Sequence, residues 1–315
     1  MVTFSLPAGA LTPPPSALLN APPTNGWTAV PGAHSLSNST DADEDAVDQA
    51  ARIETRVIQG DPDPRNELFP YAAYLQLEAG EYVATCSGSL VAPDWVVSAA
   101  HCLMHEGTQA DPGQLGVWIK GRWHNVAAVF VHQGFDDNQP PFSRPGYDIG
   151  MLKLSQASDA PTVALPAASG PPLPAPGDTV YAAGFGLDDT GLNSEVLRYT
   201  DLTAFDSGTC PQSFLDNFCA GGVTGFTCQG DSGGPIVLPT ATGDVLVGLT
   251  SWGSLDCTVP YAYYTRLTDY VDQMNIWMSS GNAGSSNSNV GTLNINQLAS
   301  AVQAWMGQQL GGGNR

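Results

Sequence analysis

Basic residues are scarce in this chain of 315 residues. It contains 10 lysines and arginines against 30 aspartates and glutamates, which gives a formal net charge of −20. A field of that sign repels nucleic acid and anionic membranes. We therefore expect neither as a partner.

Long apolar runs and metal-type cysteine pairs are also missing. No stretch is long and apolar enough to span a membrane. Residues 1–7 contain no basic residue and precede the prolines at 13–15, so the pattern of a secretory signal peptide is not evident. The six cysteines have no Cys-x-x-Cys spacing, which argues against the rival interpretation as a zinc site. Six cysteines allow 15 disulfide pairings, and disulfides imply an oxidising compartment.

What the chain does have is a serine in a glycine-rich turn, at residues 228–235 (Cys-Gln-Gly-Asp-Ser-Gly-Gly-Pro). Gly230 and Gly233 allow the backbone around Ser232 to turn tightly and to approach a substrate closely. Serine is a weak nucleophile until a base takes its proton. The turn therefore predicts a histidine and a carboxylate elsewhere, and two upstream segments supply them. His101 ends the segment Val-Val-Ser-Ala-Ala-His, and Asp148 lies in Tyr-Asp-Ile-Gly-Met-Leu.

These three segments, in the order His101, Asp148, Ser232, resemble those of the chymotrypsin/trypsin-like serine proteases over residues 57–279. The resemblance implies an all-β fold of two packed six-stranded antiparallel β-barrels with a C-terminal helix. It implies a serine endopeptidase in which His101 is the general base, Asp148 orients the imidazole and Ser232 is the nucleophile. The amides of Gly230 and Ser232 would form the oxyanion hole. The family requires no metal and no organic cofactor.

The same resemblance implies how the cysteines pair and where the protein acts. It implies disulfides between Cys86 and Cys102, Cys210 and Cys219, and Cys228 and Cys257. We expect a secreted monomer whose partners are a protein or peptide substrate and an activating protease.

Residues 1–56 are expected to be a pro-region. They are rich in proline and small polar residues and then acidic, a composition typical of disorder. Arg56 and Val57 resemble the family's activation site, where cleavage frees an amino group that pairs with the acid before the nucleophile, here Asp231. A buried Asp231 without a partner is costly, so the oxyanion site would form only after cleavage. Residues 280–315 are expected to be a Gly/Ser/Asn-rich extension with a short helix.

Specificity departs from that of trypsin. The base of the primary pocket lies six residues before the nucleophile and is an aspartate in trypsin-like members, but here it is Phe226. A substrate lysine or arginine would enter without a counter-ion, and an unpaired buried charge is expensive. With small walls at Gly253 and Ala262, the pocket should favour small or medium apolar residues. The alternative is that Phe226 turns into the core and leaves an open slot. Ser251, Trp252 and Gly253 resemble the strand that pairs with the substrate backbone.

Alternation of apolar with small or polar residues predicts strands at 69–77, 86–91, 117–119, 126–131 and 244–252, and resemblance places the C-terminal helix at 267–278. Two other functions are the alternatives. A non-catalytic homologue would act as a binding or inhibitor protein. An esterase of unrelated fold would need the order Ser, Asp, His, which this chain does not have.

Overall fold

The computed structural model describes residues 6–7, 60–79, 82–105, 107–139, 146–187, 194, 196–206, 209–210, 216–222, 225–254, 257, 259 and 261–283. The chain divides into two units, Met1–Asn275 and Ile276–Arg315. Apart from residues 6–7, the expected pro-region lies outside the described residues, and so do Arg56, Val57 and residues 284–315.

The first barrel is a closed antiparallel sheet of six strands. Around the barrel their order is β4, β3, β8, β9, β10, β5, and a pairing between β4 and β5 closes it. The strands are β3 (Ala72–Ala79), β4 (Tyr82–Ala92), β5 (Trp95–Ser98), β8 (Leu115–Ile119), β9 (Arg122–Val131) and β10 (Gly150–Leu154). Leu75, Leu90 and Val96, one from each of β3, β4 and β5, are fully buried in its core. The short strand β1 (Leu6–Pro7) pairs with β4.

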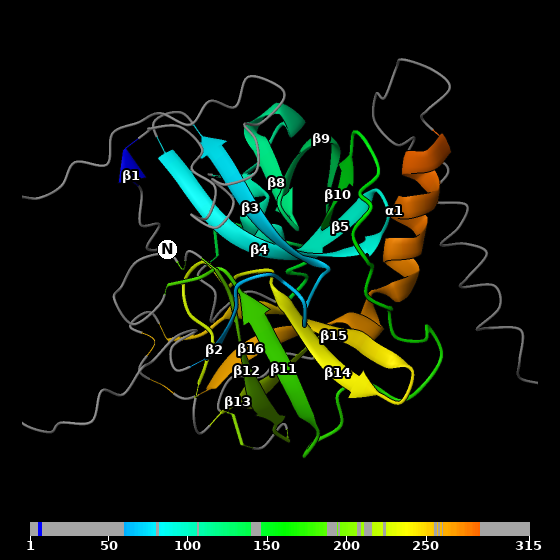
Figure 1. Cartoon of the computed structure of the whole chain (residues 1–315). Helices are drawn as coiled ribbons and strands as arrows, with labels where there is room; N and C mark the ends of the chain where they lie inside the picture. Colours follow the sequence, from blue (N-terminus) through cyan, green and yellow to red (C-terminus); the bar gives the residue numbers. More distant parts are fainter. Residues whose placement is uncertain are drawn as a thin grey trace, which may run out of the picture. The chain divides into compact units, whose positions relative to one another are not determined.

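The second barrel has the same construction. Its order is β11, β14, β15, β16, β13, β12, closed by β11 pairing with β12. The strands are β11 (Thr179–Gly184), β12 (Leu197–Ala204), β13 (Asn217–Gly221), β14 (Pro235–Thr240), β15 (Gly243–Trp252) and β16 (Tyr261–Arg266), and β2 (Asp61–Asp63) adds to β12. Its core includes Val180, Phe218, Ile236 and Tyr264. The two barrels, cyan to green and green to orange in Figure 1, confirm the all-β fold class expected.

Side chains and backbone join the barrels. Phe185, which follows β11, packs edge-on against Tyr74 of β3 and Trp118 of β8, at ring-centroid distances of 5.8 and 5.9 Å. Tyr71 donates its hydroxyl to Asp244 at 2.7 Å. The backbone N–H of Ser87 on β4 donates to the carbonyl of Ser232 at 2.8 Å. The proposed nucleophile is therefore held against the first barrel.

Short elements complete the description. Strands β6 (Met104–His105) and β7 (Thr108–Gln109) pair with each other, and η3 (Pro112–Gln114) precedes β8. Leu267–Asp269 form η5, and α1 spans Val271–Ala283, across the boundary between the two units. No helix among the described residues has both the length and the apolar character needed to cross a bilayer.

Two predicted elements begin later than expected. The strand predicted at 69–77 begins only at Ala72, because Ala72 N–H closes a turn onto Phe69 and Pro70 has no N–H to donate. The helix predicted at 267–278 begins only at Val271. Tyr270 N–H bonds to Leu267 in a 3₁₀ turn, and Tyr270 itself leaves helical geometry at φ −123° and ψ 1°.

Candidate active site

The site begins with a pair formed by His101 and Asp148. His101 lies in the 3₁₀ turn η2 (Ala100–Cys102), one residue beyond β5, and Asp148 lies just before β10, which pairs with β5. The imidazole Nδ1 is 2.7 Å from Asp148 Oδ2, and the His101 backbone N–H donates to Oδ1 at 2.9 Å. Both carboxylate oxygens therefore contact the same histidine, and the ring is fixed in orientation.

The second barrel completes the surroundings of Asp148. Ser251 donates its hydroxyl to Asp148 Oδ2 at 2.6 Å, and Thr265 donates to the Asp148 carbonyl at 3.0 Å. Burial raises the pKa of Asp148, but the charge of His101 and the hydrogen bonds from His101 and Ser251 outweigh it and hold the pKa below its ordinary value. Asp148 is therefore ionised at neutral pH, with its charge beside the imidazole of His101.

Ser251 reaches Asp148 because of a β-bulge. In the pairing of β15 with β16, Thr250 faces Tyr264 and Trp252 faces Tyr263, so Ser251 is the extra residue between them. A bulge turns a side chain away from the alternation of the strand. The family resemblance assigns Ser251 to the strand that pairs with the substrate backbone, and the structure directs its side chain to Asp148.

Ser232 lies in the turn between Gly230 and Gly233, whose φ angles are +90° and +75°. These left-handed values favour glycine. The Ser232 side chain is half-buried, and within the described chain its Oγ makes no hydrogen bond. The Cys102 sulfur lies 3.5 Å from the Ser232 carbonyl oxygen, which brings the neighbour of His101 to the backbone of Ser232.

The N–H of Gly230 is available as a hydrogen-bond donor because of the orientation of the peptide between Gln229 and Gly230. The Gln229 carbonyl accepts a hydrogen bond from Leu187 N–H at 2.8 Å. In a trans peptide the N–H points opposite to the carbonyl, so the Gly230 N–H points away from Leu187. Among the described residues it has no acceptor.

The N–H of Ser232 is available for the same reason. The Asp231 carbonyl accepts from Gly234 N–H at 2.8 Å, which directs the Ser232 N–H to the other side of that peptide. Ser87 Oγ donates to the Gly230 carbonyl at 3.0 Å and thereby fixes the peptide between the two donors. Two amides in one turn that have no acceptor among the described residues can stabilise an oxyanion.

Asp231 is completely buried beside this turn. Its carboxylate accepts N–H bonds from Gly186 at 2.8 Å and from Cys228 at 2.9 Å. Burial raises its pKa from 3.8 to about 6, and the two backbone hydrogen bonds only partly oppose that rise. No cation is paired with it in the part of the chain that the structure describes.

The residues expected around the substrate lie on neighbouring segments. Gly253 lies against Ala262, because a Cβ built on Gly253 would be 3.2 Å from the Ala262 Cβ. Trp252 stacks on Tyr263 with ring centroids 3.8 Å apart. Phe226 is half-buried and does not belong to the buried core of the second barrel.

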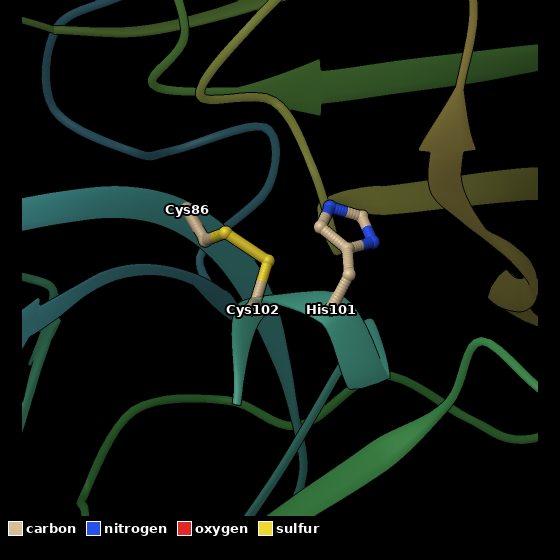
Figure 2. A group of neighbouring side chains, drawn as sticks. All are labelled: Cys86, His101 and Cys102. Carbon is tan, nitrogen blue, oxygen red and sulfur yellow. A yellow bond between two sulfur atoms is a disulfide. The ribbon is translucent and has the colours of Figure 1, made fainter. Parts of the chain in front are cut away.

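The six cysteines form the three pairs that the family resemblance implied: Cys86–Cys102, Cys210–Cys219 and Cys228–Cys257. The first lies beside His101, as Figure 2 shows. One ligand atom from each of Cys86, His101 and Cys102 lies within 4.8 Å of the others, a spacing that suits a metal. Both sulfurs belong to a disulfide, however, and a metal needs the thiolate.

Two supports of the site were missed by sequence reasoning. Ser87 contributes its N–H and its hydroxyl to the Ser232 turn, and Thr265 supports the Asp148 carbonyl. Neither residue stands in a distinctive local motif, and each acts across a long sequence separation. Only the barrel pairing brings them to the site.

Comparison with known proteins gives one family. The trypsin family model matches residues 57–274. The chain is 27% identical over 252 residues to "CLIP domain-containing serine protease B4" of Anopheles gambiae, covering 70% of each chain. It is 28% identical over 242 residues to "Coagulation factor IX" of Cavia porcellus, covering 69% of this chain and 80% of the relative.

Proposed function

Because this chain belongs to the trypsin family, we propose that it is a serine endopeptidase acting through His101, Asp148 and Ser232. The observation that carries the proposal is the 2.7 Å contact between His101 Nδ1 and the buried Asp148 Oδ2. With Nδ1 engaged, Nε2 is the nitrogen left to exchange a proton with the nucleophile.

The chemistry follows from these positions. Ser232 Oγ attacks the scissile carbonyl while His101 Nε2 takes its proton, and Asp148 stabilises the imidazolium. The N–H groups of Gly230 and Ser232 bind the resulting oxyanion, at about 3–4 kcal/mol per donor in the transition state. His101 then protonates the leaving amine. Water hydrolyses the acyl-enzyme by the same proton transfers.

The protein is made as a zymogen in this proposal. Cleavage between Arg56 and Val57 frees an ammonium that pairs with Asp231. The support is that Asp231 is completely buried, with a raised pKa, and its described hydrogen bonds come from backbone amides alone. An ammonium offsets the desolvation of that carboxylate and fixes the adjoining turn.

The primary pocket has Phe226 at its base and takes small or medium apolar side chains, not arginine or lysine. Support comes from the residues beside it. Thr227 Oγ1 and Tyr264 OH form a hydrogen bond with each other at 3.1 Å, and the sequence has no carboxylate at position 226. Since this pocket does not favour arginine, cleavage at Arg56 falls to another protease.

The setting follows from the disulfides. Three disulfides fit an oxidising compartment, so we propose a secreted enzyme with protein or peptide substrates. It acts as a monomer.

A non-catalytic binding protein is the second candidate, and it rests on Phe226 obstructing the pocket. The deciding experiment uses protein cut after Arg56, a peptide library and an organophosphonate probe, with Ser232→Ala as the matched control. We expect cleavage after small or medium apolar residues and a covalent adduct on Ser232, both absent from the control. Neither cleavage nor adduct, from protein with a confirmed Val57 terminus, would favour the binding protein.

A further inference from the structure

Asp216, just before β13, reaches from the second barrel to the segment that carries Asp148. The Tyr147 backbone N–H donates to Asp216 Oδ2 at 2.6 Å, and the Tyr270 hydroxyl donates to the same oxygen. The Asp216 carbonyl accepts from Arg266 N–H at 2.8 Å, so the residue is itself anchored to the end of β16. Asp216 thus links a fixed point of the second barrel to the residue before Asp148.

Tyr147 needs such a support. Its φ is +65°, in the left-handed region that a bulky residue rarely adopts. Such a conformation persists only where the surroundings impose it. The Tyr147 ring stacks on His132 at 4.6 Å with planes 4° apart, and its N–H is held by Asp216. Ring and backbone are therefore fixed from two sides.

The conformation of Tyr147 decides where Asp148 points, because the two residues share a peptide. On the other side of Asp148, Thr265 Oγ1 holds its carbonyl at 3.0 Å. Residues of the second barrel therefore form hydrogen bonds with two backbone atoms of the segment that carries Asp148, namely Tyr147 N and Asp148 O. The Asp148 carboxylate is then presented to His101 at 2.7 Å.

We propose that Asp216 is a positioning residue for the His101–Asp148 pair, acting through the Tyr147 backbone. This inference rests on the proposed protease function. Asp216 contacts neither His101 nor the Asp148 carboxylate in the hydrogen bonds of the described chain, so its effect falls on the orientation of the pair and not on substrate binding.

The test uses protein cut after Arg56 and three variants. Asp216→Ala removes the acceptor, Asp216→Asn keeps an acceptor oxygen without the charge, and Asp269→Ala removes a nearby carboxylate that pairs with Arg266. We expect Asp216→Ala to lower kcat about 10- to 100-fold, with KM within about twofold, which corresponds to about 1.4–2.7 kcal/mol of activation free energy. Asp216→Asn should restore most of kcat, and Asp269→Ala should behave as wild type.

Two kinetic results would overturn the inference: wild-type kcat in Asp216→Ala, or Asn and Ala variants that are equally impaired. If the Ala variant does not fold, Asp216→Glu takes its place. It keeps the charge but displaces the oxygens by a methylene, and wild-type kcat in that variant would count against the inference.

The proton NMR resonance of His101 Nδ1–H gives a readout that does not depend on turnover. It should keep its wild-type position in Asp216→Asn and move in the Ala or Glu variant, and an unmoved resonance would overturn the inference. If the wild-type protein neither cleaves nor reacts with the phosphonate, the proposed function fails, and this resonance still decides whether Asp216 positions the pair.

Discussion

Ser251 donates its hydroxyl to Asp148 Oδ2 at 2.6 Å, the same oxygen that lies 2.7 Å from His101 Nδ1. One carboxylate oxygen thus serves a residue of each barrel. The hydrogen bond from Ser251 helps to keep Asp148 ionised, because it favours the charged form of the buried group. The proposed general base is therefore oriented by an acid whose ionised form is favoured by His101 of the first barrel and, to a smaller extent, by Ser251 of the second.

Replacing Ser251 by alanine should weaken that arrangement. The pKa of Asp148 lies below 3.8, so its ionised form contributes stability above that pH, and this contribution is lost as pH falls through the folded-state pKa. Without the Ser251 hydroxyl the pKa of Asp148 rises, and acid unfolding should begin at a higher pH. We also expect kcat to fall about tenfold, measured with the cut protein.

Ser89→Ala is the matched control, because Ser89 is also a buried serine and its hydroxyl has no hydrogen-bond partner among the described residues. It should leave kcat and the acid midpoint nearly unchanged. Equal effects of the two substitutions would show that the space left by the removed hydroxyl, and not the lost hydrogen bond to Asp148, changes kcat and the acid midpoint.

The raised pKa of Asp231 predicts that the stability of the uncut chain depends on pH in the opposite direction. Its pKa is raised from 3.8 to about 6, so the folded state is favoured below pH 3.8 and loses stability as pH rises through about 6. The shift corresponds to about 3 kcal/mol at 1.36 kcal/mol per pKa unit. Urea unfolding of an uncleavable Arg56→Gln chain, with and without Asp231→Asn, should show that difference between pH 4 and pH 7.

Cleavage should remove this penalty. In protein cut after Arg56 the ammonium of Val57 pairs with the Asp231 carboxylate, so Asp231→Asn should destabilise the cut protein at pH 7 while it stabilises the uncut one. The same sign of effect in both forms would contradict the proposed activation step.

The residues of the proposed triad could be predicted from the sequence because each lies in a short local motif. Their supports could not. Ser251 meets Asp148 across 103 residues, and Asp216 meets Tyr147 across 69. The first contact depends on a β-bulge, and the second depends on a left-handed Tyr147, and neither feature leaves a mark in the order of apolar and polar residues. Asp216 appears in the sequence as one of 30 acids.

The barrels followed the same division between local and distant information. The alternation of apolar with small or polar residues indicated the strands, but their ends were decided by single contacts. Ala72 N–H bonds to Phe69 and delays the start of β3, and Tyr270 N–H bonds to Leu267 and delays α1. Such turns compete locally with strand and helix, and the apolar pattern does not reveal which wins.

The proposed pocket predicts a change of specificity in Phe226→Asp. A carboxylate at that position would supply the counter-ion that a substrate arginine lacks in the wild-type protein. We expect the ratio of kcat/KM for arginine to that for small apolar residues to rise at least about tenfold, since 1.4 kcal/mol of charge pairing is sufficient. Peptide-library cleavage by the cut variant measures this ratio.

Phe226→Ala separates charge from space at the same position. It removes the ring without adding a carboxylate, so it should widen the range of apolar residues accepted and leave arginine disfavoured. Efficient cleavage after arginine by the wild-type protein, or by Phe226→Ala as much as by Phe226→Asp, would contradict the assignment of Phe226 to the pocket base.

Gly184, at the end of β11, lies so close to Asp231 that a larger residue there should disturb the site. A Cβ built on it would overlap the Asp231 carboxylate, and the Asp231 backbone Cα would be only 3.1 Å away, so neither atom can easily move aside. Gly184→Ala should therefore displace Asp231, lower the free energy of unfolding by about 1–3 kcal/mol, and disrupt the turn that presents the Gly230 and Ser232 amides. In the cut protein we expect kcat to fall by at least about 100-fold, the loss associated with one oxyanion donor.

Gly113→Ala is the control, because nothing lies within 4 Å of its added Cβ, and it should match wild type in both urea unfolding and kcat. Full activity in Gly184→Ala would mean that the position of Asp231 does not govern the oxyanion site.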